Sequence, residues 1–119
     1  GDGSPLREFL YVDDLAEACV FAIENLNLSS DNYPIDKNGN PLYWINVGTG
    51  KDLSIRDLAL LIAKLLDYKG KIIWDKKMPD GTPRKVLNIQ KIKDLGWEPL
   101  IDINDGIKKT IKEYMQLIE

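Results

Sequence analysis

Residues 7–14 read Arg7-Glu8-Phe9-Leu10-Tyr11-Val12-Asp13-Asp14, and they are the most informative part of this 119-residue chain. Residues 9–12 form a short apolar run, which predicts a buried strand. Two aspartates follow, and Asp13 or Asp14 can cap a helix by accepting hydrogen bonds from the free N–H groups of its first turn. We therefore predict a strand that leads directly into a helix.

The helix after this strand is apolar on almost every side. Such a helix requires cover on more than one side, so we expect other parts of the molecule to pack around it. Cys19 is the only cysteine, which excludes an internal disulfide. Its apolar neighbours predict a buried structural thiol rather than a reactive one. The residues at helical spacing are Leu15, Ala18, Cys19, Ala22 and Leu26, and Val20, Phe21 and Ile23 widen the apolar face.

The rest of the chain predicts a mixed α/β fold with short strands and about four helices, in a single domain over residues 1–119. Two near-continuous apolar runs, 42–47 and 71–75, predict further strands. Residues 27–41 are rich in Ser, Asn, Asp, Pro and Gly and predict a surface loop. The later helices are expected at 54–66, where Ser54 and Asp57 resemble a capping box, after Asn88, and from Asp102 onward. The last helix should turn Ile103, Ile107, Ile111, Tyr114, Met115 and Ile118 inward.

Composition excludes several classes of protein. A net charge of −3 opposes nucleic-acid binding, which needs a positive field. No apolar run reaches the roughly 18 to 20 residues that span a bilayer, and the N-terminus does not look like a signal peptide, so we expect a cytoplasmic protein without a membrane partner. The chain has no histidine, which removes the commonest general base and the commonest zinc ligand, and we expect no metal site.

Arg7 is the first candidate binding residue. Its planar guanidinium can hold two phosphate oxygens at once, and its place between a strand and a helix start suits a diphosphate. The alternative is a surface ion pair with Glu8 or Asp13. On the residues alone, the ion pair is the favoured interpretation.

A second candidate site is the loop 79–85, Pro79-Asp80-Gly81-Thr82-Pro83-Arg84-Lys85. Its prolines stiffen the backbone, which lowers the entropy lost when a ligand binds. Asp80 could accept hydrogen bonds from ribose hydroxyls, while Arg84 or Lys85 meets phosphate. A solvated turn is the favoured alternative here, because Asp80-Gly81 is an ordinary turn pair.

Two other motifs are misleading. Tyr33 and Lys37 have the Tyr-x-x-x-Lys spacing that brings a phenol and an ammonium onto one helical face, but Pro34 and the turn at 38–41 oppose a helix there. Residues 48–51 (Gly48-Thr49-Gly50-Lys51) are similar to the end of a phosphate-binding loop, yet the remaining positions of that motif do not match. We predict a simple turn.

Together with residues 95–99 (Leu95-Gly96-Trp97-Glu98-Pro99), these motifs resemble the C-terminal part of extended short-chain dehydrogenases, the NAD-dependent epimerase/dehydratase family. The resemblance covers nearly the whole chain, including 45–50 and 55–56. Residues 7–14 are shared broadly in that family. Residues 80–85 are similar to its GDP-L-fucose-forming branch.

This resemblance implies that the chain is the substrate-binding C-terminal segment of an NADP-dependent enzyme that lacks its Rossmann half here. The parent enzyme would convert GDP-4-keto-6-deoxy-mannose to GDP-L-fucose by two epimerisations and a hydride transfer, and it would be a homodimer. Arg7 and Asp80 match substrate-contacting positions, and Arg84 and Lys85 are weaker candidates. The catalytic residues and the dinucleotide fingerprint are absent from this chain, so we expect it to bind no cofactor, to be inert alone and to self-associate.

Two alternatives stay open. The parent could be another sugar-nucleotide epimerase or dehydratase with a different base or sugar. The chain could also be a stand-alone, non-catalytic module for binding or assembly.

Overall fold

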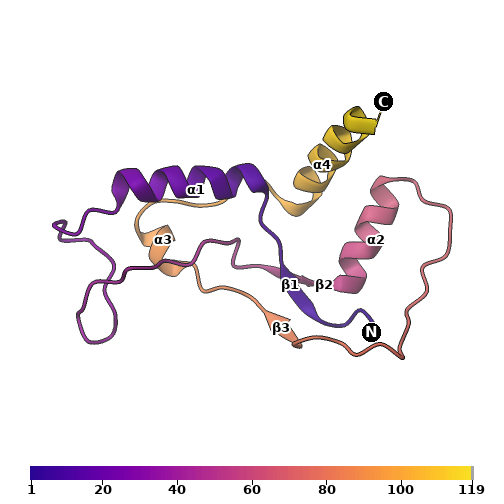
Figure 1. Ribbon diagram of the computed structural model, residues 1–119, viewed down its shortest axis with the longest axis horizontal. Coiled ribbons are helices and arrows are strands. Elements are labelled where there is room, and N and C mark those ends of the chain that lie inside the picture. The colour runs from indigo at the N-terminus through magenta and orange to yellow at the C-terminus, as the bar shows by residue number, and fades with distance from the viewer. Residues whose placement is uncertain (119) are drawn as a thin grey trace.

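A computed structural model describes residues 1–118, and Figure 1 shows an open arrangement in which α1 and α4 extend away from a small central sheet. The extents are 56 × 36 × 18 Å and the radius of gyration is 18.1 Å, against about 13.5 Å for a compact domain of this length. The predicted α/β class with short strands and four helices is confirmed. The elements are β1 (Leu6–Glu8), α1 (Val12–Asn25), β2 (Asp52–Ser54), α2 (Ile55–Leu65), β3 (Arg84–Lys85), α3 (Gln90–Asp94) and α4 (Ile103–Ile118).

The sheet has the order β2-β1-β3, with β1 antiparallel to β2 and parallel to β3. Arg7 lies opposite Leu53 on one side and opposite Lys85 on the other. Residues directly opposite each other in a sheet share a face, and neighbours along a strand alternate between faces. The register therefore places Arg7 with Lys85 on one face, and Glu8 with Asp52 on the other.

Three strand predictions were wrong. The strand at the start of the chain is Leu6–Glu8 rather than 9–12, and the helix already begins at Val12. Neither 42–47 nor 71–75 forms a strand in the described part of the chain. A strand needs a neighbour for its backbone hydrogen bonds. The short polar strands β2 and β3 have that neighbour in β1. Residues 42–47 have no such neighbour within residues 1–118, and Tyr43 and Trp44 are exposed.

The helix predictions were more accurate. The Ser54 hydroxyl accepts a hydrogen bond from the Asp57 N–H (2.9 Å) and begins α2 as expected. Asp102 Oδ1 accepts from the Asp105 N–H (3.0 Å) in the first turn of α4. The second half of α4 extends beyond the rest of the molecule (Figure 1), so its predicted inward residues Tyr114, Met115 and Ile118 are exposed.

The buried core is small and lies between α1 and the α3 region. Ala18 packs there with the buried side chains Ile89, Ile92 and Trp97. Phe21 is half-buried against this cluster, whereas Val12, Leu15, Val20 and Ile23 are exposed, Ile23 to 83%. The prediction that Cys19 is buried was wrong, because this thiol lies on the uncovered side of the helix.

Asp14 has a different role from the predicted one. Neither aspartate caps α1, which begins after Tyr11 without a side-chain cap. Asp14 is buried instead, and its Oδ2 accepts a hydrogen bond from the Ile101 N–H (2.9 Å). The carboxylate therefore joins the first helix to the segment that leads into α4, 87 residues later in the chain.

Candidate functional site

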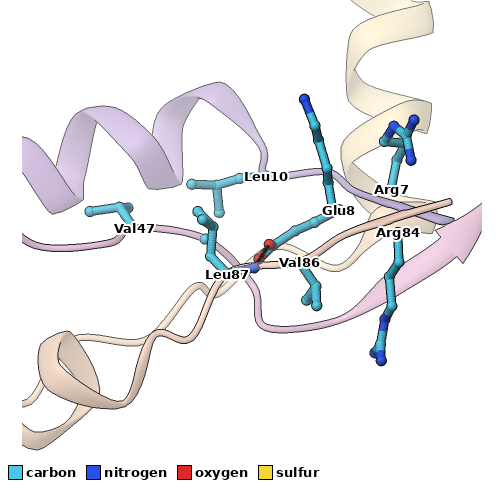
Figure 2. Close-up of a pocket in the computed structure, with 9 residues that line it drawn as sticks. Arg7, Glu8, Leu10, Val47, Arg84, Val86 and Leu87 are labelled. Carbon is cyan, nitrogen blue, oxygen red and sulfur yellow. Dashed lines mark hydrogen bonds between the residues drawn. The ribbon is translucent and has the colours of Figure 1, made fainter. Parts of the chain in front are cut away.

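A hollow of about 650 Å³ lies beside the strands β1 and β3. Figure 2 shows Arg7 and Arg84 pointing away from each other, as the strand register requires, because Arg84 lies opposite Leu6 rather than Arg7. The hollow combines the central strand β1 and the outer strand β3 with the turn before β2. It is lined by Arg7, Glu8, Leu10, Val47, Gly48, Arg84, Lys85, Val86 and Leu87.

Arg7 is half-buried and is held by its own strand. Its Nη1 donates a hydrogen bond to the Leu6 carbonyl (2.6 Å). A Cβ built on Gly81 would lie 3.1 Å from Arg7 Nη2, so the guanidinium lies directly against the 79–85 loop. Within residues 1–118, Arg7 forms no ion pair with Glu8 or Asp13. Its remaining N–H donors are therefore not committed to a carboxylate.

Asp80 shares a second hollow, of about 430 Å³, with Arg7. Both oxygens of its carboxylate lie within hydrogen-bond distance of the Asp2 N–H, at 3.1 and 3.2 Å. A carboxylate has about four lone-pair sites, so Asp80 keeps acceptor capacity for a ligand. The structure thus brings Arg7 and Asp80 together from segments more than 70 residues apart.

Trp74 forms one wall of this second hollow. The backbone of Gly3 lies against its ring, because a Cβ at that position would be 2.6 Å from the indole. Arg56 lies over the ring, 5.4 Å from its centre, in a cation–π arrangement. Arg56 is exposed but not free, since it also donates to the Asp2 carbonyl.

Arg84 and Lys85 differ although they are neighbours. Arg84 Nε lies 2.5 Å from Asp52 Oδ2. The hydrogen bond to Asp52, followed by the charge of Asp52, raises the pKa of Arg84 above its ordinary value. Lys85 lies on the same face as Arg7, directly opposite it in the register. Lys85 and Arg7 are thus the two cations that this face of the sheet brings together.

Glu8 lines the hollow but is not among the binding residues predicted from the sequence. Its Oε1 accepts from the N–H groups of Thr49 (2.5 Å) and Gly50 (2.6 Å), and its Oε2 accepts from the Leu87 N–H (2.7 Å). A glycine-rich turn can bind an anion through its backbone N–H groups. The glycines of the Gly48-Thr49-Gly50 turn were the sequence signal for an anion at this position. The anion that the turn binds is the Glu8 carboxylate of the same chain.

The two misleading motifs have structural roles. Residues 33–37 lie in a turn-rich loop and not in a helix, and the Tyr33 hydroxyl donates to the Leu42 carbonyl (2.6 Å). Residues 48–51 form the predicted turn. In residues 1–118 no group of three or more Asp, Glu or Cys side chains is arranged to hold a metal ion. Within the same residues, no helix combines the length and apolar character of a membrane span.

Known proteins are similar to this chain in sequence and in fold. The model of the NAD dependent epimerase/dehydratase family matches residues 1–35. The chain is 42% identical to GDP-L-fucose synthase 1 of Arabidopsis thaliana, over 98% of its own length and 32% of the relative. The resemblance to the epimerase/dehydratase family is confirmed.

Solved structures of this family have the same fold. The GDP-mannoheptose C4 reductase of Campylobacter jejuni, with NADP bound, superposes with a TM-score of 0.77 at 33% identity, over 97% of this chain and 33% of that one. The UDP-glucose 4-epimerase of Thermotoga maritima, with UDP-glucose, has a TM-score of 0.78 at 26% identity, over 100% and 34%. The chain therefore spans about a third of the epimerase/dehydratase proteins that it matches.

Proposed function

We propose that this chain is the GDP-sugar recognition segment of an NADPH-dependent GDP-4-keto-6-deoxy-mannose 3,5-epimerase/4-reductase, which forms GDP-L-fucose. One observation supports this most. Arg7 and Lys85 share a face of the sheet, and Arg7 also lies against the loop that carries Asp80. Two cations beside a carboxylate suit a ligand that has a diphosphate next to a ribose.

Each of these side chains would have a distinct role. Arg7 holds diphosphate oxygens with its planar fork, and Lys85 adds a point charge. Asp80 accepts hydrogen bonds from ribose hydroxyls. Arg84 contributes only if its pair with Asp52 opens, because its guanidinium is otherwise engaged. These contacts orient the substrate and can accelerate a reaction whose chemical groups lie elsewhere in the protein.

NADP is the cofactor of the proposed parent enzyme, but the described residues do not fit it. The turn Gly48-Thr49-Gly50 is similar to a phosphate-binding loop, yet two of its N–H groups already bind the Glu8 carboxylate. A phosphate there would have to displace this carboxylate. We therefore assign NADP binding to the remainder of the parent protein.

Binding measurements on the full-length protein test the proposal. A GDP-sugar should bind at least tenfold more tightly than the matching UDP- and dTDP-sugars, in isothermal titration with NADP present. Equal or tighter binding of a UDP-sugar would favour a UDP-hexose epimerase, a possibility raised by the likeness to the Thermotoga maritima enzyme. The reading frame upstream of Gly1 separates either enzyme from a stand-alone module, since only an enzyme requires a dinucleotide-binding half there.

A further inference from the structure

We propose that Glu8 is a positioning residue for the GDP-sugar site, because it holds β3 and the 48–50 turn against β1 and so fixes Lys85 relative to Arg7. This inference rests on the proposed function. Figure 2 shows the Glu8 side chain reaching toward the backbone at Leu87, away from Arg7.

The carboxylate joins two segments that are far apart in the sequence. Its Oε1 binds the Thr49 and Gly50 N–H groups, at 2.5 and 2.6 Å, and its Oε2 binds the Leu87 N–H at 2.7 Å. Hydrogen bonds to an ionised acceptor are shorter and stronger than neutral ones. Glu8 therefore contributes three such bonds from the strand position next to Arg7.

The strand β3 needs this support because it has only two residues, Arg84 and Lys85. Just before it, the Pro83 carbonyl accepts a hydrogen bond from the Leu6 N–H (2.8 Å). Just after it, Leu87 is held by Glu8. The two bonds lie on either side of Lys85, and both attach to β1, the strand that carries Arg7. The Glu8 carboxylate thus holds the end of β3 that follows Lys85, and the distance between Lys85 and Arg7 depends on it.

Gly48 supports the same interpretation. A Cβ built at this position would overlap Oε1 of Glu8, and Gly48 itself is buried. Only glycine lets the backbone come this close to the carboxylate. The Gly48→Ala substitution should therefore displace the Glu8 side chain without removing its charge.

The experiment uses the full-length protein. It measures the single variants Glu8→Gln and Gly48→Ala and the double variant that combines these two substitutions, and it compares all three with the single variant Arg7→Ala. We expect Glu8→Gln and Gly48→Ala each to raise KM for GDP-4-keto-6-deoxy-mannose about five- to thirtyfold, with kcat changed less than about threefold. The reason is that contacts to the diphosphate stabilise the bound substrate and the transition state equally. KM for NADPH should stay within about twofold.

The double variant should be no worse than the more impaired single variant, since both substitutions act on one carboxylate. Glu24→Gln, on the exposed side of α1, is the matched control and should leave every constant unchanged.

Several outcomes would overturn the inference. If Arg7→Ala raises the substrate KM but Glu8→Gln and Gly48→Ala only lower the melting temperature, Glu8 is a structural brace and the proposed function stands. If Arg7→Ala has no effect on the substrate KM, the proposed function fails and this inference falls with it. If neither Glu8→Gln nor Gly48→Ala gives folded protein, the carboxylate is a folding determinant and the positioning role is rejected.

Discussion

Arg84 and Asp52 form an ion pair across the central strand, since Arg84 belongs to β3, Asp52 belongs to β2, and β1 lies between them. The two side chains share the face opposite Arg7. The Asp52 side chain is 13% exposed and that of Arg84 is 62% exposed, so the pair is covered on its acidic side only. It therefore ties the outer strands together at a partly solvated surface.

This pairing predicts that Arg84 stabilises the fold more than it binds substrate. Arg84→Ala should lower the urea midpoint of the full-length protein slightly, because exposed ion pairs contribute little, and it should change the substrate KM much less than Arg7→Ala does. Asp52→Asn should have a similar effect on the midpoint, and the double variant should add little to either. A substrate KM that rises as much in Arg84→Ala as in Arg7→Ala would instead make Arg84 a direct ligand.

Arg7 is predicted to hold the diphosphate. Arg7→Ala removes one or two charge-assisted hydrogen bonds, each worth about 1.5–3 kcal/mol. Substrate kcat/KM should then fall by about ten- to a thousandfold, while NADPH affinity stays nearly constant. Arg7→Lys should restore only part of the loss, because an ammonium lacks the planar fork.

The control for Arg7 follows from the structure. Arg56 is exposed, but it contacts Trp74 and the Asp2 carbonyl beside the Asp80 hollow, so Arg56→Ala is not a neutral reference. Lys112, exposed on α4, is the better one, and Lys112→Ala should leave substrate kinetics unchanged. If Arg7→Ala lowers thermal stability alone, its role is structural and the site assignment is wrong.

The isolated 119-residue chain is predicted to be catalytically inert. It has no histidine, and its Tyr33 and Lys37 lie in a loop and not on a helix. With NADPH and GDP-4-keto-6-deoxy-mannose present, the absorbance of the reduced nicotinamide should fall no faster than in a protein-free blank. Turnover clearly above that blank would contradict the prediction.

The isolated chain is also predicted to self-associate through its uncovered apolar surface. Ile23 and Tyr43 are each 83% exposed and Trp44 is 67% exposed, and large exposed apolar patches commonly drive association. Sedimentation should show species heavier than the monomer, and a hydrophobic dye should bind. Ile23→Lys should reduce both effects, whereas Glu24→Lys, one residue away, adds the same positive residue without removing apolar surface. A monomer that binds no dye would contradict this prediction.

Acid should loosen the loop around Asp36. Hydrogen bonds from the Asn40 N–H and then from the Asn38 N–H hold the pKa of Asp36 below its ordinary value. Because the folded-state pKa is the lower one, this carboxylate stabilises the loop above the unfolded-state pKa, and the contribution is lost as pH falls through the folded-state pKa. The protection factors of Asn38 and Asn40, from NMR amide exchange corrected for the intrinsic pH dependence of exchange, should fall in that range. Asp36→Asn should remove the pH dependence of these protection factors, and protection factors that do not change with pH in the native protein would contradict the prediction.

Local sequence signals were enough to locate the helices. Ser54 and Asp102 accept hydrogen bonds from N–H groups a few residues away, so their roles depend on short stretches that are visible in the sequence. The same holds for the turn at 48–51. The family resemblance likewise rests on contiguous motifs, and it points to Arg7 and Asp80 as candidates, whereas their proximity depends on the fold.

Long-range pairing could not be predicted in this way. The strand partners of β1 are short and polar, and only the folded chain brings Asp52–Ser54 and Arg84–Lys85 to its two edges. The same pairing determines that Arg84 faces away from Arg7 and that Lys85 faces with it. Residues 42–47 have the pattern of a buried strand but no partner within residues 1–118, so the backbone hydrogen bonds of a strand are not made there.

The sequence by itself determined the helical segments, the α/β class and the resemblance to the epimerase/dehydratase family, because capping, periodicity and contiguous motifs are local properties. Only the tertiary structure decided which cations share a face, that Asp14 binds the Ile101 N–H instead of capping α1, and that the glycine turn binds Glu8. The physical reason is the same in each case. A carboxylate or a strand edge is satisfied by whichever donors the fold brings within about 3 Å, and those donors lie 41 to 87 residues away in the chain.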